Sequence, residues 1–568
     1  MQKRSIVKNL FDGNIEEDFI FPFPTQSEEE RENLDFLIDS LRKFAKEKIN
    51  PKKLEEEGKI SWEILNALGE MGIFGMIIPE EYEGFGMSQW AYNRVMEEMA
   101  KIDASLATML GAHESIGVKP LLLYGNEEQK RKFLPSIAKG EKIAAFCLTE
   151  ASAGSDPSSI KTKAKISDDG KYLILDGSKL FVTNGSFRGI YTVFAKLEDT
   201  DEKKDSFIAL LVPGDLEGIS ISKEEEKLGI KASSTVEITF ENVKVPKENL
   251  IGEIGKGLKI ALEALDWGRL GLAAGCVGGA KELLRISSEY SRERVQFGSP
   301  ISDFELIKKK LSRIAFLTYA ADSMVYLTAG ISERDDVDFS LESAICKTFA
   351  SEILWESVNE ALQVAGGYGY TKDYPYEKYL RDARINTIFE GTNEIQRLFI
   401  ALYGIRGVGE YLKQMGRALK SPFTSIGILK DFAYKEIKKR IAPEKLKGIP
   451  SPLKREANMV SQYTQALSIW TERVLKRYGK KIIEKEYILE RLADVAIYLY
   501  GMLATLSKTD SIIKEKSLEN SSYEIMLCKA FFFEARKQIR HRISYLNRNI
   551  DDFWSEISKN IIKGKTIS

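Results

Sequence analysis

The chain has 568 residues, of which 43% are hydrophobic and 29% charged, and its formal net charge is −1. This length is too great for one hydrophobic core, so two to four domains of a soluble globular protein are expected. The near-zero net charge gives no general attraction to nucleic acid, and no nucleic-acid partner is predicted.

Cysteine and histidine are rare and scattered. No paired CxxC spacing occurs, so the sequence predicts neither a zinc site nor a disulfide framework, no metal is expected, and a reducing compartment fits. With two histidines, a base acting near neutral pH is expected to be a carboxylate with a raised pKa. A lone histidine such as His113 is more often structural than part of a site. The residues are Cys147, Cys276, Cys346, Cys528, His113 and His541.

The beginning of the chain, "MQKRSIVKNLFDGNIEEDF", lacks the apolar core of a signal peptide and carries acids that transit peptides avoid. No uncharged apolar run reaches the ~18 residues that a membrane-spanning helix needs. The sequence therefore predicts a cytoplasmic location.

The periodicity of apolar residues changes three times along the chain. Residues from about 27 to 138 have helical periodicity. Short β-branched or aromatic strands such as "YTVFAKL" and "SFIALLVP" follow as far as about 245. Helical periodicity returns from about 255 to 412, and more helices follow a Pro- and Lys-rich join. The predicted domains are an N-terminal helical domain at 27–142, a middle β-domain at 143–252, a helical bundle at 253–415 and a C-terminal helical extension at 416–568.

Two stretches near the predicted strands suit a planar ligand. "FCLTEASAGSD", residues 146–156, is rich in small and hydroxyl residues and could bring a ligand close to the backbone. In "DGSKLFVTNG", Phe181 and Thr183 are two residues apart and share a face if the segment is a strand. The ring could pack on a planar group while the hydroxyl donates a hydrogen bond. A flexible loop and an ordinary turn are the alternative interpretations.

Two later stretches suit phosphate groups. "SRERVQFGSP" presents Arg292, Arg294 and Gln296 before a Gly-Pro break, and arginine beside backbone donors favours a phosphate. "QVAGGYGY", residues 363–370, is glycine-dense, but it is not a strand–GxGxxG–helix fingerprint, which disfavours a nicotinamide-binding fold. A solvated helix end is the alternative for the arginines.

The stretch "RINTIFEGTNEIQRLF" places Glu390 between an apolar pair and a glycine turn. One interpretation is a solvated acid before a helix capped by Thr392 or Asn393. The other is a functional carboxylate whose pKa is raised by burial beside Ile388 and Phe389. These residues alone leave both open.

The order of these five stretches resembles the acyl-CoA dehydrogenase family of flavoenzymes. The resemblance runs from about residue 27 to 412. It continues in "ILERLADVAIYLYGMLATLSK" and "IMLCKAFFFEA", which are similar to the very-long-chain branch of the family with its C-terminal helical extension. It implies a mainly α fold with a central β-domain: an N-terminal helical domain, a β-barrel-like middle domain, a four-helix bundle and an extra C-terminal helical domain.

The resemblance also implies FAD as the cofactor. Thr149 would bond the isoalloxazine, Ser155 would meet flavin phosphate or substrate, and Thr183 would bond near the flavin N5. Ala151 replaces the usual Pro, and Phe181 stands where Trp is common. The implied cofactor-binding residues are Phe146, Leu148, Thr149, Ser155, Phe181, Val182, Thr183, Arg294, Gln296, Phe297, Gln363, Val364, Gly366, Gly367, Thr392 and Glu394. Arg294 and the stretch 363–367 match residues that reach the FAD of a neighbouring subunit, which implies a homo-oligomer, and a dimer is expected.

Glu390 matches the catalytic base of most of the family. A minority carry that Glu where Gly268 stands, so the base has not moved. The resemblance implies that Glu390 removes the α-proton of an acyl-CoA, that a hydride leaves the β-carbon for the flavin, and that its backbone N–H contacts the thioester carbonyl. The product is a trans-2-enoyl-CoA, and an electron-transfer flavoprotein accepts the electrons in fatty acid β-oxidation. The implied substrate-binding residues are Ser155, Asp266, Arg269 and Gly391.

Two alternatives remain on the same fold: an acyl-CoA oxidase that uses oxygen, and a non-enzymatic assembly or scaffold protein. Small residues Gly111 and Ala112 lie where relatives floor the acyl pocket, which predicts long-chain acyl-CoA, although close helix packing requires small residues equally.

The join at residues 421–456 is locally basic. From residue 430 to 456 it carries nine Lys or Arg against four Asp or Glu, with apolar residues interleaved. This pattern predicts either peripheral contact with an anionic membrane, at its inner face, or a solvated linker.

Overall fold

The computed structural model describes residues 3–198, 206–420 and 445–565. The chain forms two compact units. The large unit comprises residues 24–335 and 346–393, and the small unit comprises residues 1–23, 336–345 and 394–568.

The large unit begins with a layer of helices that start at side-chain caps. The Ser27 hydroxyl accepts a hydrogen bond from the third N–H of α2, and the Ser88 hydroxyl does the same for α5. A wider π-helical segment, Ala112–Val118, joins α6 to α7. The helices are α2 (Glu28–Lys48), α3 (Pro51–Glu57), α4 (Trp62–Glu70), α5 (Gln89–Ile102), α6 (Ala104–Gly111), α7 (Lys119–Tyr124) and α8 (Glu127–Ala138).

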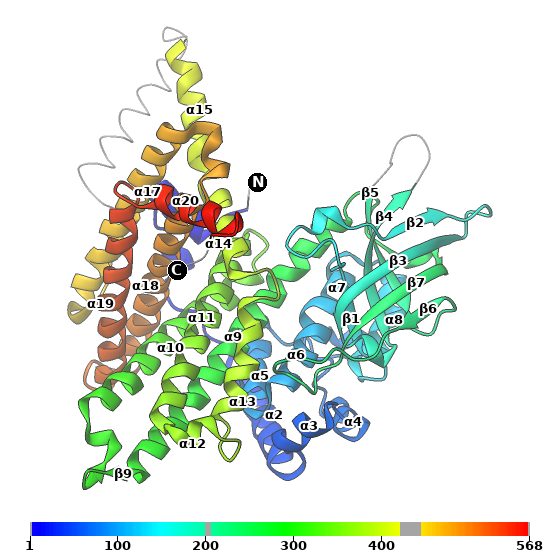
Figure 1. Cartoon of the computed structure of the whole chain (residues 1–568), viewed down its shortest axis with the longest axis horizontal. Helices are drawn as coiled ribbons and strands as arrows, with labels where there is room; N and C mark the ends of the chain where they lie inside the picture. Colours follow the sequence, from blue (N-terminus) through cyan, green and yellow to red (C-terminus); the bar gives the residue numbers. More distant parts are fainter. Residues whose placement is uncertain (1–2, 199–205, 421–444, 566–568) are drawn as a thin grey trace. The chain divides into compact units, whose positions relative to one another are not determined.

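A mostly antiparallel sheet follows, in the order β6-β7-β3-β2-β4-β5-β8, with β1 parallel to β4 (Figure 1). The pairing of β3 with β7 shifts register between Lys179 and Val182, and Phe181 there has a φ of 57°. Such irregularities re-aim side chains, and the Phe181 ring is 59% exposed while Phe194 and Phe240 are buried. The strands are β1 (Ala144–Cys147), β2 (Lys163–Ile166), β3 (Tyr172–Thr183), β4 (Ile190–Glu198), β5 (Ser206–Pro213), β6 (Ile219–Ile221), β7 (Thr235–Pro246) and β8 (Leu250–Ile251).

Long helices complete the large unit, and α9 packs against α5 and α10. The contact with α5 is close, since a β-carbon at Gly278 would lie 2.3 Å from the carbonyl oxygen of Glu97. Among the described residues α10 alone is long and apolar enough to span a bilayer, and 78% of its apolar window is buried inside the protein. The elements are α9 (Gly257–Glu293), β9 (Val295–Gln296), β10 (Ser299–Pro300), α10 (Glu305–Ser332), α11 (Ser340–Ala365, from Cys346 on), α12 (Gly367–Tyr370) and α13 (Tyr376–Ala383).

The small unit is helical. Its helix α18 packs against both α17 and α19 and buries residues on all sides, including Tyr500 and Leu503 (Figure 1). The short N-terminal helix α1 packs against α15, α17 and α18. The architecture agrees with the predicted mainly α fold with a central β-domain. The elements are α1 (Ile6–Asp12), α14 (Asn393–Gly404, from Glu394 on), α15 (Arg406–Lys420), α17 (Lys454–Tyr478), α18 (Glu486–Lys516), α19 (Ser522–Tyr545) and α20 (Asp551–Ile562).

Candidate active site

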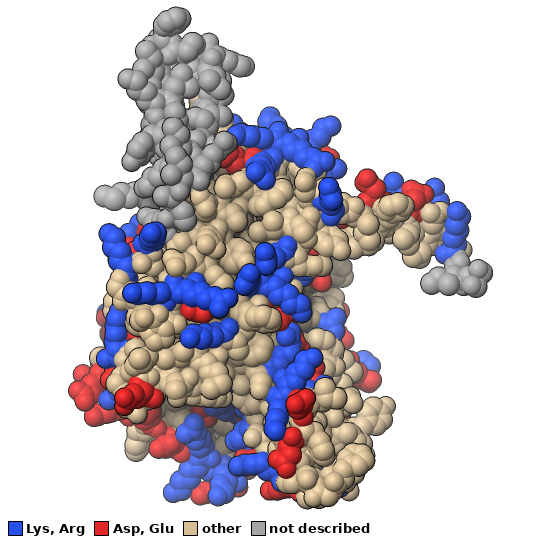
Figure 2. Space-filling model, turned by 90° about the vertical axis from the view of Figure 1, so that its left-hand side faces the viewer, with Lys and Arg blue, Asp and Glu red and all other residues tan. Residues whose placement is uncertain are grey.

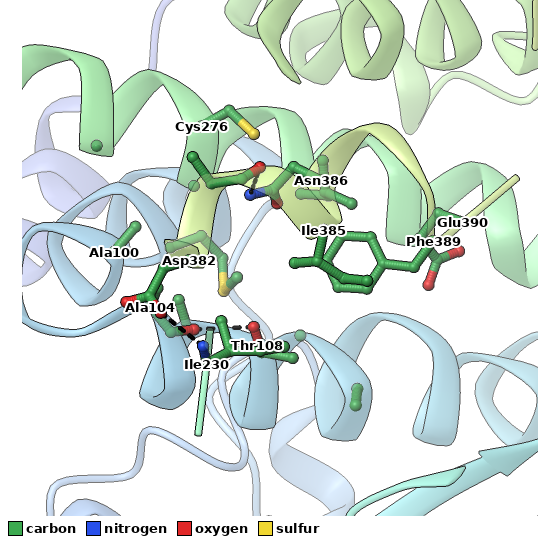
Figure 3. A pocket seen from close by; sticks show the side chains of 18 of the residues that line it. Ala100, Ala104, Thr108, Ile230, Cys276, Asp382, Ile385, Asn386, Phe389 and Glu390 are labelled. Atoms are coloured by element: carbon green, nitrogen blue, oxygen red, sulfur yellow. Dashed lines mark hydrogen bonds between the residues drawn. The ribbon is translucent and has the colours of Figure 1, made fainter. Parts of the chain in front are cut away.

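A cavity lies inside the large unit with Glu390 in its wall. In Figure 3 Glu390 and Phe389 lie at one side of the cavity, and Ala100 and Ala104 lie at the other. The lining comes from α5, α6, α9, α13 and the π-helical segment. Most of it is small or apolar, so the cavity is an elongated apolar space with a carboxylate near one end.

Glu390 lies in a turn that few sequences can adopt. Its φ is 58°, and the φ of Gly391 is 86°. A non-glycine residue in this left-handed region costs about 1–3 kcal/mol and persists only where the surroundings hold it. Arg269 Nε donates to the backbone carbonyl oxygen of Glu390 at 3.2 Å, and its Nη1 binds Asp266 Oδ1 at 2.6 Å. The two predicted substrate-side residues on α9 therefore support the Glu390 turn.

Burial raises the pKa of Glu390 to about 7, while the positive charges of Arg269 and Lys347 act in the opposite direction. The carboxylate oxygen Oε2 is shielded from solvent. A β-carbon at Gly268 would lie 3.2 Å from this oxygen and 2.6 Å from Ile116 Cγ2, so the shielding comes from α9 and the π-helical segment.

The sequence-based account of this burial was half right. Phe389 lines the cavity, but Ile388 is 45% exposed. Ile388 and Phe389 are adjacent in sequence, but their side chains have different surroundings. Only Phe389 therefore contributes to the apolar wall of the cavity. Asn393 is not simply a cap, because its side chain bonds Lys347 and Ser351 inside the unit.

The loop after β1 lies against β3. Leu180 N–H donates to the carbonyl oxygen of Thr149 at 2.9 Å. The buried amine of Lys179 donates to Leu148 O at 3.1 Å and to Glu150 Oε1 at 2.7 Å. The Glu150 carboxylate also accepts the N–H groups of the two residues before β2. This buried ion pair fixes the loop that carries Thr149 beside the strand that carries Phe181.

These residues fit a flavin. Phe181 offers an exposed ring, Thr183 lines the Glu390 cavity, and nothing lies within 4 Å of where a β-carbon at Gly154 would be. Thr183 thus brings a hydroxyl to the cavity, and the exposed Phe181 ring lies two residues before it on the same strand. Ser155 is exposed on the same loop, and Val182 is buried beneath it. Phe146 packs on Phe194 and Leu148 is buried in the core, so these two support the loop from behind.

Other predicted cofactor residues lie in a different hollow of the large unit. Arg294, Gln296, Phe297, Val364, Gly366 and Gly367 line it together. The Arg294 guanidinium lies 5.7 Å from the centre of the Tyr368 ring, and Phe297 is 96% exposed. Gln363 is exposed beside this hollow and is not part of its lining. Thr392 is half-buried after Gly391, and Glu394 lies in the first turn of α14, in the small unit.

Sequence reasoning missed the buried lysines Lys179 and Lys347. The position of Lys179 inside the predicted flavin-binding stretch "DGSKLFVTNG" could have indicated a role for it. No motif surrounds Lys347, so nothing in the local sequence indicates its burial. His113 is structural: its Nδ1 accepts the Ala144 N–H at 2.9 Å, which leaves Nε2–H to donate to Phe74 O at 3.1 Å. Burial lowers the pKa of His113 to about 4, so it stays neutral. The basic stretch at 421–444 lies outside the described residues.

Four family models match the chain in series. They are "Acyl-CoA dehydrogenase, N-terminal domain" at residues 31–141, "Acyl-CoA dehydrogenase, middle domain" at 145–243, "Acyl-CoA dehydrogenase, C-terminal domain" at 255–403 and "ACAD9/ACADV, C-terminal domain" at 451–567.

Curated relatives match over nearly the whole chain. The very long-chain specific acyl-CoA dehydrogenase, mitochondrial, of Homo sapiens is 38% identical over 98% of this chain and 86% of its own length. A probable acyl-CoA dehydrogenase of Bacillus subtilis (strain 168) is 34% identical over 84% of this chain and 80% of its own length.

Solved structures give the same result. An acyl-CoA dehydrogenase complexed with FAD from Bacillus anthracis has a TM-score of 0.82 and 33% identity, covering 95% of this chain and 91% of that chain. The butyryl-CoA dehydrogenase from Megasphaera elsdenii has a TM-score of 0.64 and 38% identity, covering 67% of this chain and all of its own. A chain described under the electron transferring flavoprotein of Acidaminococcus fermentans has a TM-score of 0.63 and 37% identity, covering 67% of this chain and 99% of that chain.

Proposed function

Because this chain belongs to the acyl-CoA dehydrogenase family, we propose that it oxidises long-chain acyl-CoA thioesters to trans-2-enoyl-CoA, with Glu390 as the base. The protein is an FAD-dependent acyl-CoA dehydrogenase of fatty acid oxidation. We propose four further properties: the length of the substrate, the roles of individual residues, the electron acceptor and the assembly. The observation that carries the proposal is the carboxylate of Glu390 in the wall of an elongated apolar cavity.

Glu390 takes the α-proton on its carboxylate as the Cα–Cβ double bond forms. Thr149, Phe181 and Thr183 would hold FAD, which would supply the acceptor for the β-hydrogen and its electron pair. A base whose pKa is about 7 is about half ionised at pH 7 and binds a proton far more strongly than an ordinary carboxylate. The apolar lining excludes water, which preserves the basicity of the carboxylate and strengthens the hydrogen bonds in the site.

The small and apolar lining of the cavity supports a long acyl chain. Gly111 and Gly275 both line the cavity, and a β-carbon added at either would be in ordinary van der Waals contact with a side chain, Met96 Cε at 3.5 Å or Ala100 Cβ at 3.7 Å. For the two small residues singled out in the sequence, Gly111 and Ala112, their place in the cavity lining supports room for an acyl chain over close helix packing. Each methylene buried there would contribute about 0.8 kcal/mol.

The test is a series of straight-chain substrates under identical conditions. We expect kcat/KM to rise from butyryl-CoA through octanoyl-CoA to palmitoyl-CoA, with bleaching of the bound flavin by each productive substrate. A maximum at butyryl-CoA or octanoyl-CoA would refute the long-chain assignment.

We also propose a homodimer. Arg294, Phe297 and Gly366 line a hollow whose lining is separate from that of the Glu390 cavity, which supports a cofactor site shared between two chains. A second copy would complete each site. Light scattering of the flavin-loaded protein should give twice the mass of the chain, and Arg294→Ala should lower FAD retention at unchanged fold. A flavin-loaded monomer would contradict the dimer.

For the electron acceptor we propose an electron-transfer flavoprotein, in keeping with the likeness to a chain described with one. With palmitoyl-CoA present, turnover should depend on added electron-transfer flavoprotein and yield little peroxide. Fast peroxide formation without an added acceptor would make the protein an oxidase.

We propose that the protein is cytoplasmic and that its small unit touches an anionic membrane. Arg455, Arg536 and Arg540 line one groove, and Phe533 and Met526 on α19 are 73% and 63% exposed. Figure 2 views the side on which α17 and α19 lie, and Lys and Arg side chains gather over it. Apolar side chains beside cations suit an anionic lipid surface.

Co-sedimentation with vesicles of phosphatidylglycerol and phosphatidylcholine tests this contact. The wild type should bind at low salt and detach at high salt. Replacing the three groove arginines with Glu should abolish binding while leaving palmitoyl-CoA turnover unchanged. Equal binding of both proteins would show that the groove is not the contact.

A further inference from the structure

Lys347 lies in α11 with its side chain fully buried. Its amine donates to the carbonyl oxygen of Gly391 at 2.8 Å and to Asn393 Oδ1 at 2.8 Å. A buried lysine without a compensating partner is strongly unfavourable, so lysine is rarely kept inside a helix bundle for packing alone. Both oxygens that it binds belong to the turn that carries Glu390.

Two cations hold consecutive carbonyl groups of that turn. Arg269 binds the carbonyl oxygen of Glu390 at 3.2 Å, and Lys347 binds that of Gly391 at 2.8 Å. Both residues of the turn have positive φ values. Because a strained turn relaxes unless its polar groups are fixed, these contacts keep the Glu390 side chain directed at the cavity.

The second oxygen that Lys347 binds is itself fixed. Asn393 Nδ2 donates to Ser351 Oγ at 3.0 Å and to Glu352 Oε1 at 3.2 Å, and both partners lie on α11. Lys347, Ser351 and Glu352 therefore form one row along the helix beneath the turn.

We propose that Lys347 is a positioning residue of the reaction, which holds the Glu390–Gly391 turn and whose positive charge keeps the Glu390 carboxylate ionised. The proposal rests on the role of Glu390 proposed above. Helix α11 supplies no group that takes the proton. Through Lys347 it would set the pH range in which Glu390 can remove the proton.

The charged and titratable surroundings agree with this role. Glu390 faces Arg269 on α9, Lys347 on α11 and the phenol of Tyr92 on α5. Lys347 faces Cys276, Glu390, Arg269 and Glu352. Burial lowers the pKa of Lys347 to about 8, so it is mostly cationic at pH 7, and burial raises the pKa of Cys276 to about 12, so that thiol is neutral.

Variants separate the two effects of Lys347. Lys347→Met removes the charge and the hydrogen bonds, whereas Lys347→Gln removes the charge and keeps a donor for Gly391. Flavin reduction by palmitoyl-CoA is followed by stopped flow from pH 6 to 9. The protonated carboxyl band of Glu390 is titrated in parallel by infrared difference spectroscopy, with Glu390→Gln as the blank.

For the wild type both midpoints should lie near pH 7. Loss of a nearby opposite charge should raise them by about 1 pH unit or more in both variants. A shift of that size would slow reduction at pH 7 about fivefold and leave little loss at pH 9. Lys347→Met should lose additional rate at every pH, because its turn is no longer held.

The matched control is Lys281→Met on α9. Lys281 is bound by two acids, Glu97 at 2.7 Å and Asp322, and it lines neither the Glu390 cavity nor the hollow that contains Arg294. Its variant should lose stability but keep the wild-type midpoints. Wild-type midpoints in both Lys347 variants would overturn the proposal, even with a slower rate. If Glu390→Gln itself reduced the flavin normally, the base assignment would fail instead.

Discussion

A β-carbon at Gly268 would lie 3.2 Å from Glu390 Oε2 and 2.6 Å from Ile116 Cγ2. Gly268 is in the middle of α9, where an alanine would ordinarily stabilise the helix by about 1 kcal/mol. We expect Gly268→Ala to push the carboxylate and Ile116 apart. A displacement of this kind should slow flavin reduction by about 10²-fold with FAD content preserved. Stopped-flow reduction by palmitoyl-CoA measures the effect.

Gly275→Ala is the matched substitution seven residues further along α9. Its β-carbon would approach nothing nearer than Ala100 Cβ at 3.7 Å, far from the carboxylate side of the cavity. We expect normal reduction by octanoyl-CoA and a lower kcat/KM with palmitoyl-CoA, because the deep part of the cavity becomes narrower. Equal effects of the two alanine variants on both substrates would mean that Gly268 acts only through general packing.

Glu390→Gln should keep FAD and bind acyl-CoA but scarcely bleach. The amide has nearly the same shape as the carboxylate and cannot take the α-proton. Removal of a positioned base is expected to slow the reductive step by about 10²–10⁴-fold. Binding is measured by the shift of the flavin spectrum on adding palmitoyl-CoA, and near wild-type reduction would remove Glu390 from its role.

The stability of the small unit should depend on pH because Glu342 binds a proton more strongly in the folded state. Its Oε1 accepts the Val7 N–H and the Ser5 hydroxyl, each at 2.8 Å, and burial raises its pKa to about 7. A folded-state pKa above the unfolded value means that this contribution is complete below about pH 4.5 and is lost as pH rises through 7. Glu342→Gln has no such loss. Its Tm should therefore exceed the wild-type Tm at pH 8.5, and the difference should shrink toward pH 5.

The Lys179–Glu150 ion pair is expected to be strongly coupled. Lys179→Met leaves the buried Glu150 without its cationic partner and should cost about 3–5 kcal/mol in the free energy of unfolding, measured by urea denaturation. The double variant Lys179→Met with Glu150→Gln should lose less than the sum of the two single changes. Strict additivity would show that the two side chains act independently.

The sequence predicted the parts of the site that are local in the chain. The loop at Thr149, the strand at Phe181 and the acid at Glu390 each stand in a recognisable motif, and the predicted family and cofactor are confirmed by the comparisons. Phe181 is exposed because of a register shift in β3, which no alternation pattern indicates.

The parts created by tertiary packing were not predictable. In the sequence "ESAICKTFAS" nothing distinguishes Lys347 from a lysine on the exposed face of a helix. Its burial is favourable because the Gly391 turn, which is distant in sequence, supplies a carbonyl oxygen for its amine. Ile388 was expected to shield Glu390, but Gly268 and Ile116 do so from segments more than a hundred residues away. The π-helical register at His113 likewise depends on a bond to Ala144, in the next domain of the chain.

The N-terminal helix α1 has a consequence for synthesis on the ribosome. Its apolar residues Ile6, Val7, Leu10 and Phe11 are buried, and α1 packs against α15, α17 and α18. At about 5–20 residues per second, α18 leaves the ribosome roughly 25–100 s after α1. Until α15 follows, roughly 20–80 s after α1 at the same rate, the segment has none of these three helices to cover it. The nascent chain therefore presents a short apolar helix to chaperones for most of its translation, and a prematurely terminated chain presents it permanently to proteases.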